Sequence, residues 1–338
     1  MDAKKVAVLI ESWGEPWNEG YKNLARYIVE MLSDSVNINV IPADKVKFSS
    51  LENFDLIHIF NYTIPLHLFV RFARVKKPIV KHIAKKEVDI NVKSFARTLL
   101  NTRFVWDAFI ATTDILAEEV RRLVRDKPVF YLPPPIPTDF FKKLDKDECR
   151  ELLGLKNDEI YIGYTGTLNR FRNLGLILKA LRLINDKRKE KIKFILSLTN
   201  VKPEELAQLK EYINNMNQIK LLTVKDVRLI YSSIDALIYP VKREGAIEPP
   251  LTILEAMSCE CIVVAYRNIV TSKLILDGYN GFTFSDSEDL AKIIRHLIDG
   301  RLDGRIAENA RKTIVKSYDS SMLCKFYVRL YEQILDEL

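Results

Sequence analysis

The sequence predicts an α/β protein built from two Rossmann-like, doubly wound domains. In the first half, short apolar runs alternate with amphipathic segments. A proline-rich stretch, YLPPPIP at residues 131–137, then breaks the pattern, and a similar alternation begins again after it. Because strands that alternate with helices form parallel sheets covered on both faces, each half is expected to fold around one such sheet.

The first half contains apolar runs of strand length and amphipathic runs of helix length. The predicted strands are residues 6–10, 36–41, 55–60, 78–80, 108–111 and 129–132. The predicted helices are residues 21–32, 65–75 and 115–124. A proline cluster continues neither kind of element and makes a stiff connector, so the domain boundary is expected directly after it.

The second half repeats the pattern. Its predicted strands are residues 160–164, 193–196, 236–239 and 262–265, and its predicted helices are residues 174–184, 203–214, 252–258, 287–298, 303–316 and 320–338. We therefore expect an N-terminal domain at residues 1–140 and a C-terminal domain at residues 141–318. Residues 319–338 are expected to form a final helix that crosses back to the N-terminal domain.

The composition is that of an ordinary soluble protein. The net charge of +7 suits an anionic ligand or surface but is too small to indicate nucleic acid. The four cysteines show no paired metal spacing and are expected to be reduced thiols of a cytoplasmic protein: Cys149, Cys259, Cys261 and Cys324. No apolar run is long enough to span a membrane, so any membrane contact is expected to be peripheral.

The stretch EPPLTILEAM at residues 248–257 carries the clearest chemical signal. Apolar runs lie on both sides of it, so it is expected to open a helix between two strands. Proline suits a first helical turn, where its missing N–H is no loss. The free N–H groups of that turn attract phosphate, and Glu255, about one turn further in, can accept hydrogen bonds from sugar hydroxyls. These features indicate nucleotide binding on an α/β sheet.

Four segments of the chain, taken in order, resemble a known family. YLPPPIPTDFF at residues 131–141 resembles its interdomain segment iPNGvDtxxF, and GYTGTLNRFRN at residues 163–173 resembles its loop vGRLxxxKN/G. EPPLTILEAM resembles EPFGxxxLEAMA, and DGYNGF at residues 277–282 resembles the turn DGxNGxL. The family is that of the retaining glycosyltransferases of the two-Rossmann-domain (GT-B) type, family 4. The resemblance implies two domains that face each other across a cleft, with a nucleotide-diphosphate-sugar donor bound by the second.

The resemblance also implies a donor-binding loop. Gly166, Thr167 and Arg172 match this loop, with Thr167 where the family has arginine and Arg172 where it has lysine. Because a guanidinium binds phosphate oxygens in a bidentate way, Arg172 is expected to stabilise the departing diphosphate as a catalytic residue. Arg170 is expected to cover for the arginine replaced by Thr167. The alternative is that both arginines are solvated loop residues.

Two glutamates resemble the family's glutamate pair. Glu255 matches the carboxylate that holds the ribose hydroxyls, and its alternative is an exposed glutamate favoured by the helix dipole. In the family seven residues separate the pair, whereas six separate Glu248 from Glu255, and Ile247 stands at the strict position. Glu248 is expected to contact the transferred sugar as a catalytic residue if the loop is reshaped by one residue.

The first half also supplies candidate site residues. Gly14 and Gly20 flank the loop after the first strand, which in this fold faces the donor phosphates and the acceptor, and glycine permits close backbone approach there. His82 follows a predicted strand start where the family often carries a catalytic histidine. An alignment shifted by two residues puts Ala84 there instead. His58 is interpreted as a packed histidine at the end of a strand.

Neither a cofactor nor a metal ion is required in this scheme, because the nucleotide-sugar is a substrate. The other glycosyltransferase fold usually carries a metal on an aspartate pair of the D-x-D type. Asp145-Lys146-Asp147 has that spacing. It lies in a charged connector, however, where a solvated surface is expected.

A basic stretch indicates where a membrane could contact the protein. Residues 71–103 contain ten basic and two acidic side chains, and apolar residues are interleaved with the first of them. A basic amphipathic segment can lie on an anionic membrane surface. The alternative is an ordinary helix whose apolar face packs on the core. Relatives of this fold that act on lipid-linked acceptors favour peripheral contact with the inner face of the membrane.

The sequence therefore predicts a retaining glycosyltransferase that moves a sugar, of hexosyl type, from a nucleotide-diphosphate-sugar to an acceptor hydroxyl. The acceptor is expected to be a glycan, with a lipid-linked glycan among the candidates. The alternative is a catalytically weakened GT-B protein that binds nucleotide-sugar or glycan as a subunit. No nucleic-acid partner is expected, because the basic stretch carries neither a known motif nor a set of exposed stacking aromatics.

Overall fold

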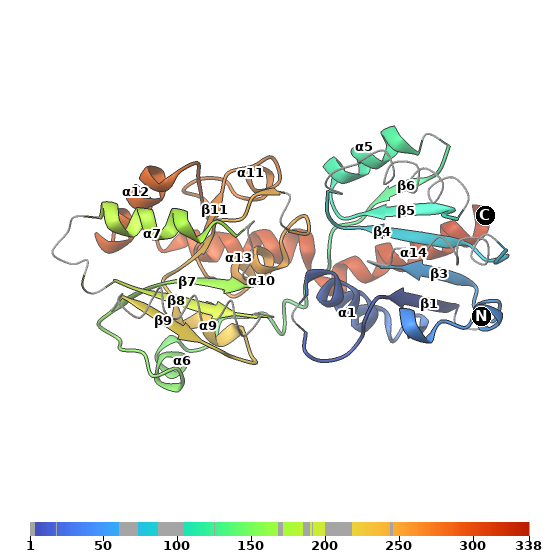
Figure 1. Ribbon diagram of the computed structural model, residues 1–338, viewed down its shortest axis with the longest axis horizontal. Coiled ribbons are helices and arrows are strands. Elements are labelled where there is room, and N and C mark those ends of the chain that lie inside the picture. Colours follow the sequence, from blue (N-terminus) through green and yellow to red (C-terminus); the bar gives the residue numbers. More distant parts are fainter. Residues whose placement is uncertain are drawn as a thin grey trace. The chain divides into compact units, whose positions relative to one another are not determined.

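In the computed structural model the chain forms two compact units, each built on a six-stranded sheet (Figure 1). The structure describes residues 4–17, 19–60, 74–86, 105–124, 126–167, 172–184, 190, 192–199, 218–243 and 246–337. The first unit comprises Met1–Pro137, Ile247–Pro249 and Tyr318–Leu338, and the second comprises Thr138–Ala246 and Pro250–Ser317. The predicted α/β class with two doubly wound domains is confirmed.

The sheet of the first unit has the strand order β2-β1-β3-β4-β5-β6, and neighbouring strands are parallel. Its strands are β1 (Lys5–Ile10), β2 (Asn37–Pro42), β3 (Leu56–Ile59), β4 (Ile79–Ile83), β5 (Ala108–Ala111) and β6 (Val129–Tyr131). All side chains of β3 and β5 are buried. This burial is expected of a parallel sheet with both faces covered.

Helices cover both faces of this sheet. They are α1 (Gly20–Leu32), the short η1 (Ala43–Lys45) and α2 (Phe48–Leu51), α5 (Asp114–Leu123) and α14 (Ser320–Glu337). Leu116 and Val120 of α5 share an apolar core with Ile57 and Ile59 of β3. His58 lies between these two residues and therefore points to the opposite face, where α14 packs. The C-terminal helix is thus part of the first unit.

A chain of polar groups lies in the core between this sheet and α14. His58 Nδ1 lies 2.7 Å from the hydroxyl of Tyr331, and His58 Nε2 lies 3.1 Å from Nδ1 of His82. Both histidines are fully buried. Burial, with a smaller effect of the Lys81 charge, lowers the pKa of His58 to about 3. Burial also lowers the pKa of His82 well below its ordinary value, so both rings are neutral at pH 7.

The sheet of the second unit has the strand order β12-β11-β10-β7-β8-β9 and is also parallel. Its strands are β7 (Ile160–Gly166), β8 (Ile192–Leu198), β9 (Ile219–Leu222), β10 (Ala236–Tyr239), β11 (Val263–Tyr266) and β12 (Phe282–Phe284). Its helices are α6 (Lys146–Leu152), α7 (Leu174–Leu183), α9 (Arg228–Ser233), α10 (Leu251–Ser258), α11 (Thr271–Leu274), α12 (Ser287–Ile298) and α13 (Arg305–Tyr318). Helices α7 and α12 lie side by side and share one apolar core with the sheet (Figure 1).

Each sheet reverses its strand order at one point. The reversal lies between β1 and β3 in the first unit and between β7 and β10 in the second. In doubly wound proteins the connections that follow two such strands leave toward opposite faces of the sheet. Ligands of doubly wound proteins bind at such reversal points. The residues that follow these strands are therefore the first candidates for a site.

Some elements differ from the prediction. The charged run that was expected to be a connector contains α6, because the Asp145 carboxylate accepts a hydrogen bond from the Glu148 N–H (2.9 Å) and caps the helix. Strands β9 and β12 have no counterpart among the predicted strands, because β9 is only partly buried and β12 is short. The predicted helix at residues 203–214, and that at residues 65–75 apart from its last two residues, lie outside the described residues.

Gly281, which precedes β12, is expected to tolerate no side chain. Its φ is +156°, and an added Cβ would lie 2.8 Å from the backbone oxygen of Val263. Gly281→Ala should therefore lower the free energy of unfolding by roughly 1–3 kcal/mol. In the matched control Gly175→Ala, the added Cβ meets no atom within 4 Å, and stability should stay equal or rise. Urea unfolding measures both, and equal stabilities would contradict the prediction.

Because of the buried histidines, the free energy of unfolding is expected to decrease as the pH is lowered from neutral. An unfolded histidine takes up a proton near pH 6.5, whereas folded His58 does so only near pH 3. The stabilisation is therefore complete above pH 6.5 and is lost as the pH falls, by about 1.4 kcal/mol per pH unit for each such histidine.

The measurement is the urea unfolding midpoint at several pH values from 7.5 to 5.5, which lies above the titration of ordinary carboxyl groups. His58→Gln should flatten the dependence on pH. His296→Gln, at an exposed position of α12, is the control and should leave it unchanged. A wild-type urea midpoint that is constant over this pH range would contradict the prediction that the buried histidines lower stability at acidic pH.

Candidate functional site

The reversal point of the second sheet gathers side chains from two strand ends. β7 ends at Gly166, whose φ of +135° favours glycine, and Thr167 follows. The Tyr164 hydroxyl donates a hydrogen bond to the Thr167 carbonyl (2.7 Å) and so fixes this turn. Tyr239 ends the neighbouring strand β10 and is buried. The turn and the two tyrosines thus lie at the carboxyl edge of the sheet.

Arg172 joins this group from just before α7. Its NH2 donates a hydrogen bond to Thr167 Oγ1 (3.1 Å), and its guanidinium also hydrogen-bonds to Tyr239. Its Nε is buried and has no hydrogen-bond partner among the described residues. A buried donor without an acceptor is costly, and a phosphate oxygen would satisfy it. The geometry therefore suits an anionic ligand.

The positive charge of Arg172 affects both tyrosines. Burial raises the pKa of Tyr239 above its ordinary value, while the charge and the hydrogen bond of Arg172 act in the opposite direction. Burial likewise raises the pKa of Tyr164, and Arg172 again opposes the shift. Both tyrosines are therefore neutral at pH 7. They provide hydroxyls but no negative charge that would neutralise the arginine.

Glu255 lies in α10 and is only 6% exposed. Its Oε2 accepts a hydrogen bond from the hydroxyl of Tyr231 in α9 (3.1 Å). The side chain is therefore not the solvated helix-start glutamate of the alternative interpretation. A buried carboxylate that is oriented by a tyrosine can present its lone pairs in fixed directions to ligand hydroxyls.

Glu248 belongs to the first unit, although it falls within the expected C-terminal domain. Its N–H donates a hydrogen bond to the carbonyl of Ala84 (2.6 Å), and its carbonyl accepts one from the hydroxyl of Thr112. These contacts fix Ile247–Pro249 to the carboxyl ends of β4 and β5. Glu248 and Glu255 therefore lie in different units, a division that residue spacing alone does not indicate.

The two predicted glycines lie in or beside the connection between β1 and α1. Gly14 has a φ of +99°, and a side chain there would meet open space. Gly20 is the first residue of α1, and an added Cβ would approach Cγ2 of Ile247 to 3.3 Å. Gly14 thus permits the turn of the loop, and Gly20 permits the close approach of the Ile247 side chain.

His82 lies inside the first unit, in the polar chain beneath the sheet. A catalytic role for it stays a prediction, but its ring is fully buried and its Nε2 has no hydrogen-bond partner among the described residues. Ala84, the alternative position, lies at the carboxyl edge, where its N–H donates to the Tyr21 hydroxyl (2.9 Å). His58 is packed, as expected, but it lies inside β3 rather than at the end of the strand, and its Nε2 faces the buried His82.

Other expected features fall elsewhere. Arg170 and most of the basic stretch at residues 71–103 lie outside the described residues. Among the described residues, no group of histidine, cysteine or carboxylate side chains could hold a metal ion. No helix in the described part of the chain combines the length and the apolar character that crossing a membrane requires.

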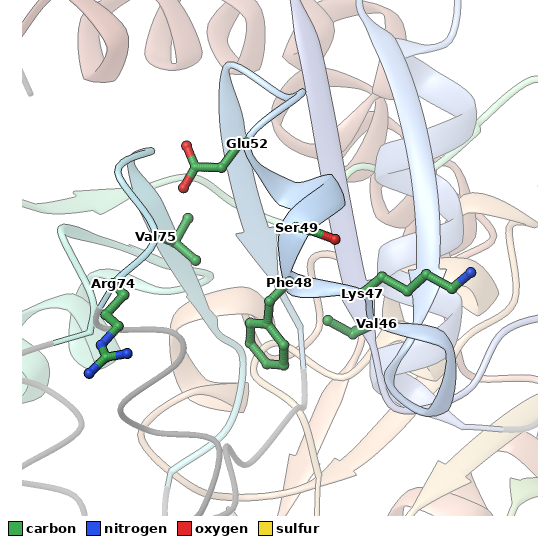
Figure 2. A pocket seen from close by; sticks show the side chains of 7 residues that line it. All are labelled: Val46, Lys47, Phe48, Ser49, Glu52, Arg74 and Val75. Atoms are coloured by element: carbon green, nitrogen blue, oxygen red, sulfur yellow. The ribbon is translucent and has the colours of Figure 1, made fainter.

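A hollow of about 630 Å³ opens on the first unit. It is lined by Val46, Lys47, Phe48, Ser49, Glu52, Arg74 and Val75. Figure 2 shows the Phe48 ring between Arg74 on one side and Val46 and Lys47 on the other. Phe48 and Val75 also pack against the core shared with α5. The hollow contains none of the predicted site residues.

The tyrosines of the site escape prediction from the sequence. Tyr164 and Tyr239 appear there as apolar strand residues, and Tyr231 precedes a predicted strand. Tyr239 is the last residue of a strand that precedes the EPPLTILEAM segment, and this position is the one signal that could have marked it. The hydrogen bond between Tyr231 and Glu255 joins two helices and depends on tertiary packing.

Comparisons with known proteins show the family of the chain. Residues 145–313 match the protein-family model of the glycosyl transferases group 1. An uncharacterized glycosyltransferase of Methanocaldococcus jannaschii is 26% identical over 185 residues, which are 53% of this chain and 46% of that protein. The match thus spans less than half of that relative's length.

Two solved structures have a similar fold. The crystal structure of Anabaena HepE in complex with UDP has a TM-score of 0.78 and 17% identity, with 98% of this chain and 100% of that chain covered. The crystal structure of WaaG, a glycosyltransferase involved in lipopolysaccharide biosynthesis, has a TM-score of 0.74 and 15% identity, with 96% and 99% covered. At these identities the likeness concerns the fold.

The family match covers the second unit from α6 to α13, including the Arg172 group and Glu255. It extends over residues 145–313 of 338, which is half of the chain. The chain therefore belongs to the glycosyl transferases group 1, a family of glycosyltransferase enzymes.

Proposed function

We propose that the chain is a retaining glycosyltransferase that moves a sugar from a nucleotide-diphosphate-sugar to an acceptor hydroxyl. The observation that carries the proposal is the buried, unsatisfied Nε of Arg172 at the reversal point of the second sheet. The Anabaena HepE structures contain UDP, and in one case UDP-glucose. A nucleoside diphosphate would supply the oxygen that this arginine lacks.

The proposed reaction needs charge stabilisation at the leaving group. The bond between the anomeric carbon and the diphosphate oxygen breaks, and that oxygen keeps the electron pair. The acceptor oxygen bonds to the anomeric carbon, and its proton ends on the departing diphosphate. Arg172 and the first N–H groups of α10 stabilise the developing charge. Glu255, held by Tyr231, accepts hydrogen bonds from the ribose hydroxyls.

Thermal stabilisation across a panel of nucleotide-sugars identifies the donor, because a ligand that binds the native state raises the unfolding temperature. Incubation with the best donor and an acceptor then tests transfer, and NMR of the product's anomeric proton tests retention. Binding without transfer or donor hydrolysis would support the alternative, a weakened relative that acts as a binding subunit. An inverted product would refute the retaining mechanism.

Arg172→Ala is expected to lower kcat/KM by roughly 10²–10³-fold, because it removes a donor that stabilises leaving-group charge. Arg172→Lys keeps the charge but not the fork of donors, so its activity should lie between the two. Arg305→Ala removes an exposed arginine of the same unit that pairs with Asp303, and serves as the control. Equal rates for Arg172→Ala and Arg305→Ala would show that Arg172 does not assist the reaction.

The proposal includes a cytoplasmic enzyme that meets a lipid-linked glycan at the inner face of the membrane. Arg74 and Lys76, at the described end of the basic stretch, are exposed on the first unit. Each basic side chain near an anionic surface contributes on the order of 1 kcal/mol. Salt should weaken this attraction, because it screens exposed charges.

Replacing Arg74 and Lys76 together by serine should therefore weaken binding to phosphatidylserine vesicles by roughly thirtyfold. Lys292 and Lys312, exposed on the second unit, give the matched control when both are replaced by serine. Co-sedimentation at low and high salt measures the binding. Equal pelleting with neutral and anionic vesicles would remove the membrane from the proposal and leave the transfer reaction untouched.

A further inference from the structure

The loop between β1 and α1 follows the first of the two strands at which the sheet of the first unit reverses. It therefore lies where a doubly wound unit binds its ligand. Its side chains are unusual for such a position, because the loop carries two of the three tryptophans of the chain, Trp13 and Trp17. Both are partly exposed, and the carboxylate of Glu15 between them is exposed.

The two indoles form a corner. The Trp13 and Trp17 ring centroids are 5.1 Å apart, and the ring planes meet at 84°. Neither indole N–H donates a hydrogen bond to another described residue. The corner thus presents apolar ring surface together with two indole N–H groups.

Helix α1 holds this corner in place. Lys22 is only 7% exposed, and its Nζ donates a hydrogen bond to the carbonyl of Pro16 (3.0 Å). Lys22 and Arg26, one turn apart, both lie over the Trp17 ring, at 5.4 and 4.8 Å from its centroid. Within the described part of the chain, Lys22 pairs with no carboxylate, so its contacts in this loop are the ones that hold it. A corner fixed in this way loses little conformational entropy when a ligand binds.

We propose that the Trp13–Trp17 corner is a sugar-binding subsite that holds a pyranose ring of the acceptor. A pyranose has an apolar face of C–H groups and a rim of hydroxyls, so one ring plane can stack on its face while the indole N–H groups and Glu15 meet its rim. A flat nucleobase fits less well, since two perpendicular planes cannot both stack on it. This inference rests on the proposed function and assigns its acceptor to a carbohydrate rather than to an aliphatic alcohol.

Tryptophan fluorescence tests the subsite without catalysis. The Trp106→Phe variant removes the one tryptophan outside the loop, which is buried in the core of the first unit, so the remaining emission comes from Trp13 and Trp17. The probes are methyl β-D-glucopyranoside, methyl N-acetyl-β-D-glucosaminide and maltose, with UDP and a sugar-free alkyl detergent as comparisons. A saturable change with at least one sugar, absent after the further change Trp17→Ala, is the expected result.

The kinetic test separates this subsite from the donor site. In an otherwise wild-type chain, Trp13→Ala or Trp17→Ala should raise KM for the acceptor by roughly tenfold. Donor hydrolysis and the Kd for UDP should remain unchanged. Trp17→Phe should lie in between, and circular dichroism verifies that each variant is folded.

Three results would overturn the proposal: no saturable change with any of the sugars, a change with UDP alone, or a change with the detergent alone. A failure of the proposed transfer function would give a different result from a failure of the subsite. In that case no nucleotide-sugar is hydrolysed or transferred by the wild-type chain, whereas sugar binding to the corner is still measured directly by fluorescence.

Discussion

The chemistry of both units depends on one geometric constraint of parallel sheets. Every strand of such a sheet ends at the same edge, and the connections can part to opposite faces only where the strand order reverses. In the second unit this point lies between β7 and β10, and it places Thr167, Tyr239 and Arg172 in contact. In the first unit it lies beside β1 and exposes the loop with the paired tryptophans.

The Arg172 group shows how the fold prepares a charge for a ligand. The two hydroxyl groups that hold Arg172 are neutral and do not offset its positive charge, and partial removal from water strengthens the field of that charge. A carboxylate partner would satisfy the guanidinium in the absence of ligand and would oppose an incoming phosphate. Tyr239 and Thr167 avoid this competition, since they orient the side chain without neutralising it. The family's arginine at the Thr167 position is thus replaced by a residue that positions Arg172.

The sequence predicts the strands and helices that have a clear pattern of apolar residues. It does not predict those in which this pattern is weak. β5, β10 and α12 have the predicted bounds, because their apolar periodicity is uninterrupted. α6 is hidden because its residues are mostly charged, and a helix capped by Asp145 needs few apolar contacts to form. β9 is hidden because its side chains are only partly buried.

The candidate site, too, can be predicted only in part from the sequence. Arg172 and Glu255 can be named from motifs, because motifs record the residue that touches a ligand. Their partners Tyr239 and Tyr231 cannot, because the direction of a strand or helix side chain toward another element is a tertiary property. For the same reason no motif indicates that Glu248 belongs to the first unit.

Different charged side chains lie at the two reversal points, and we assign them to different substrates of the proposed sugar transfer. In the second unit the buried Nε of Arg172 has no hydrogen-bond partner among the described residues, which suits a diphosphate. In the first unit Lys22 is occupied by the Pro16 carbonyl and the Trp17 ring, Arg26 lies over the same ring, and Glu15 adds an exposed carboxylate to the loop. Such a surface combines aromatic rings with charged groups of both signs, which suits a ligand with an apolar face and a rim of hydroxyl groups. Under the proposed function, the second unit would bind the anionic donor and the first unit a neutral sugar of the acceptor.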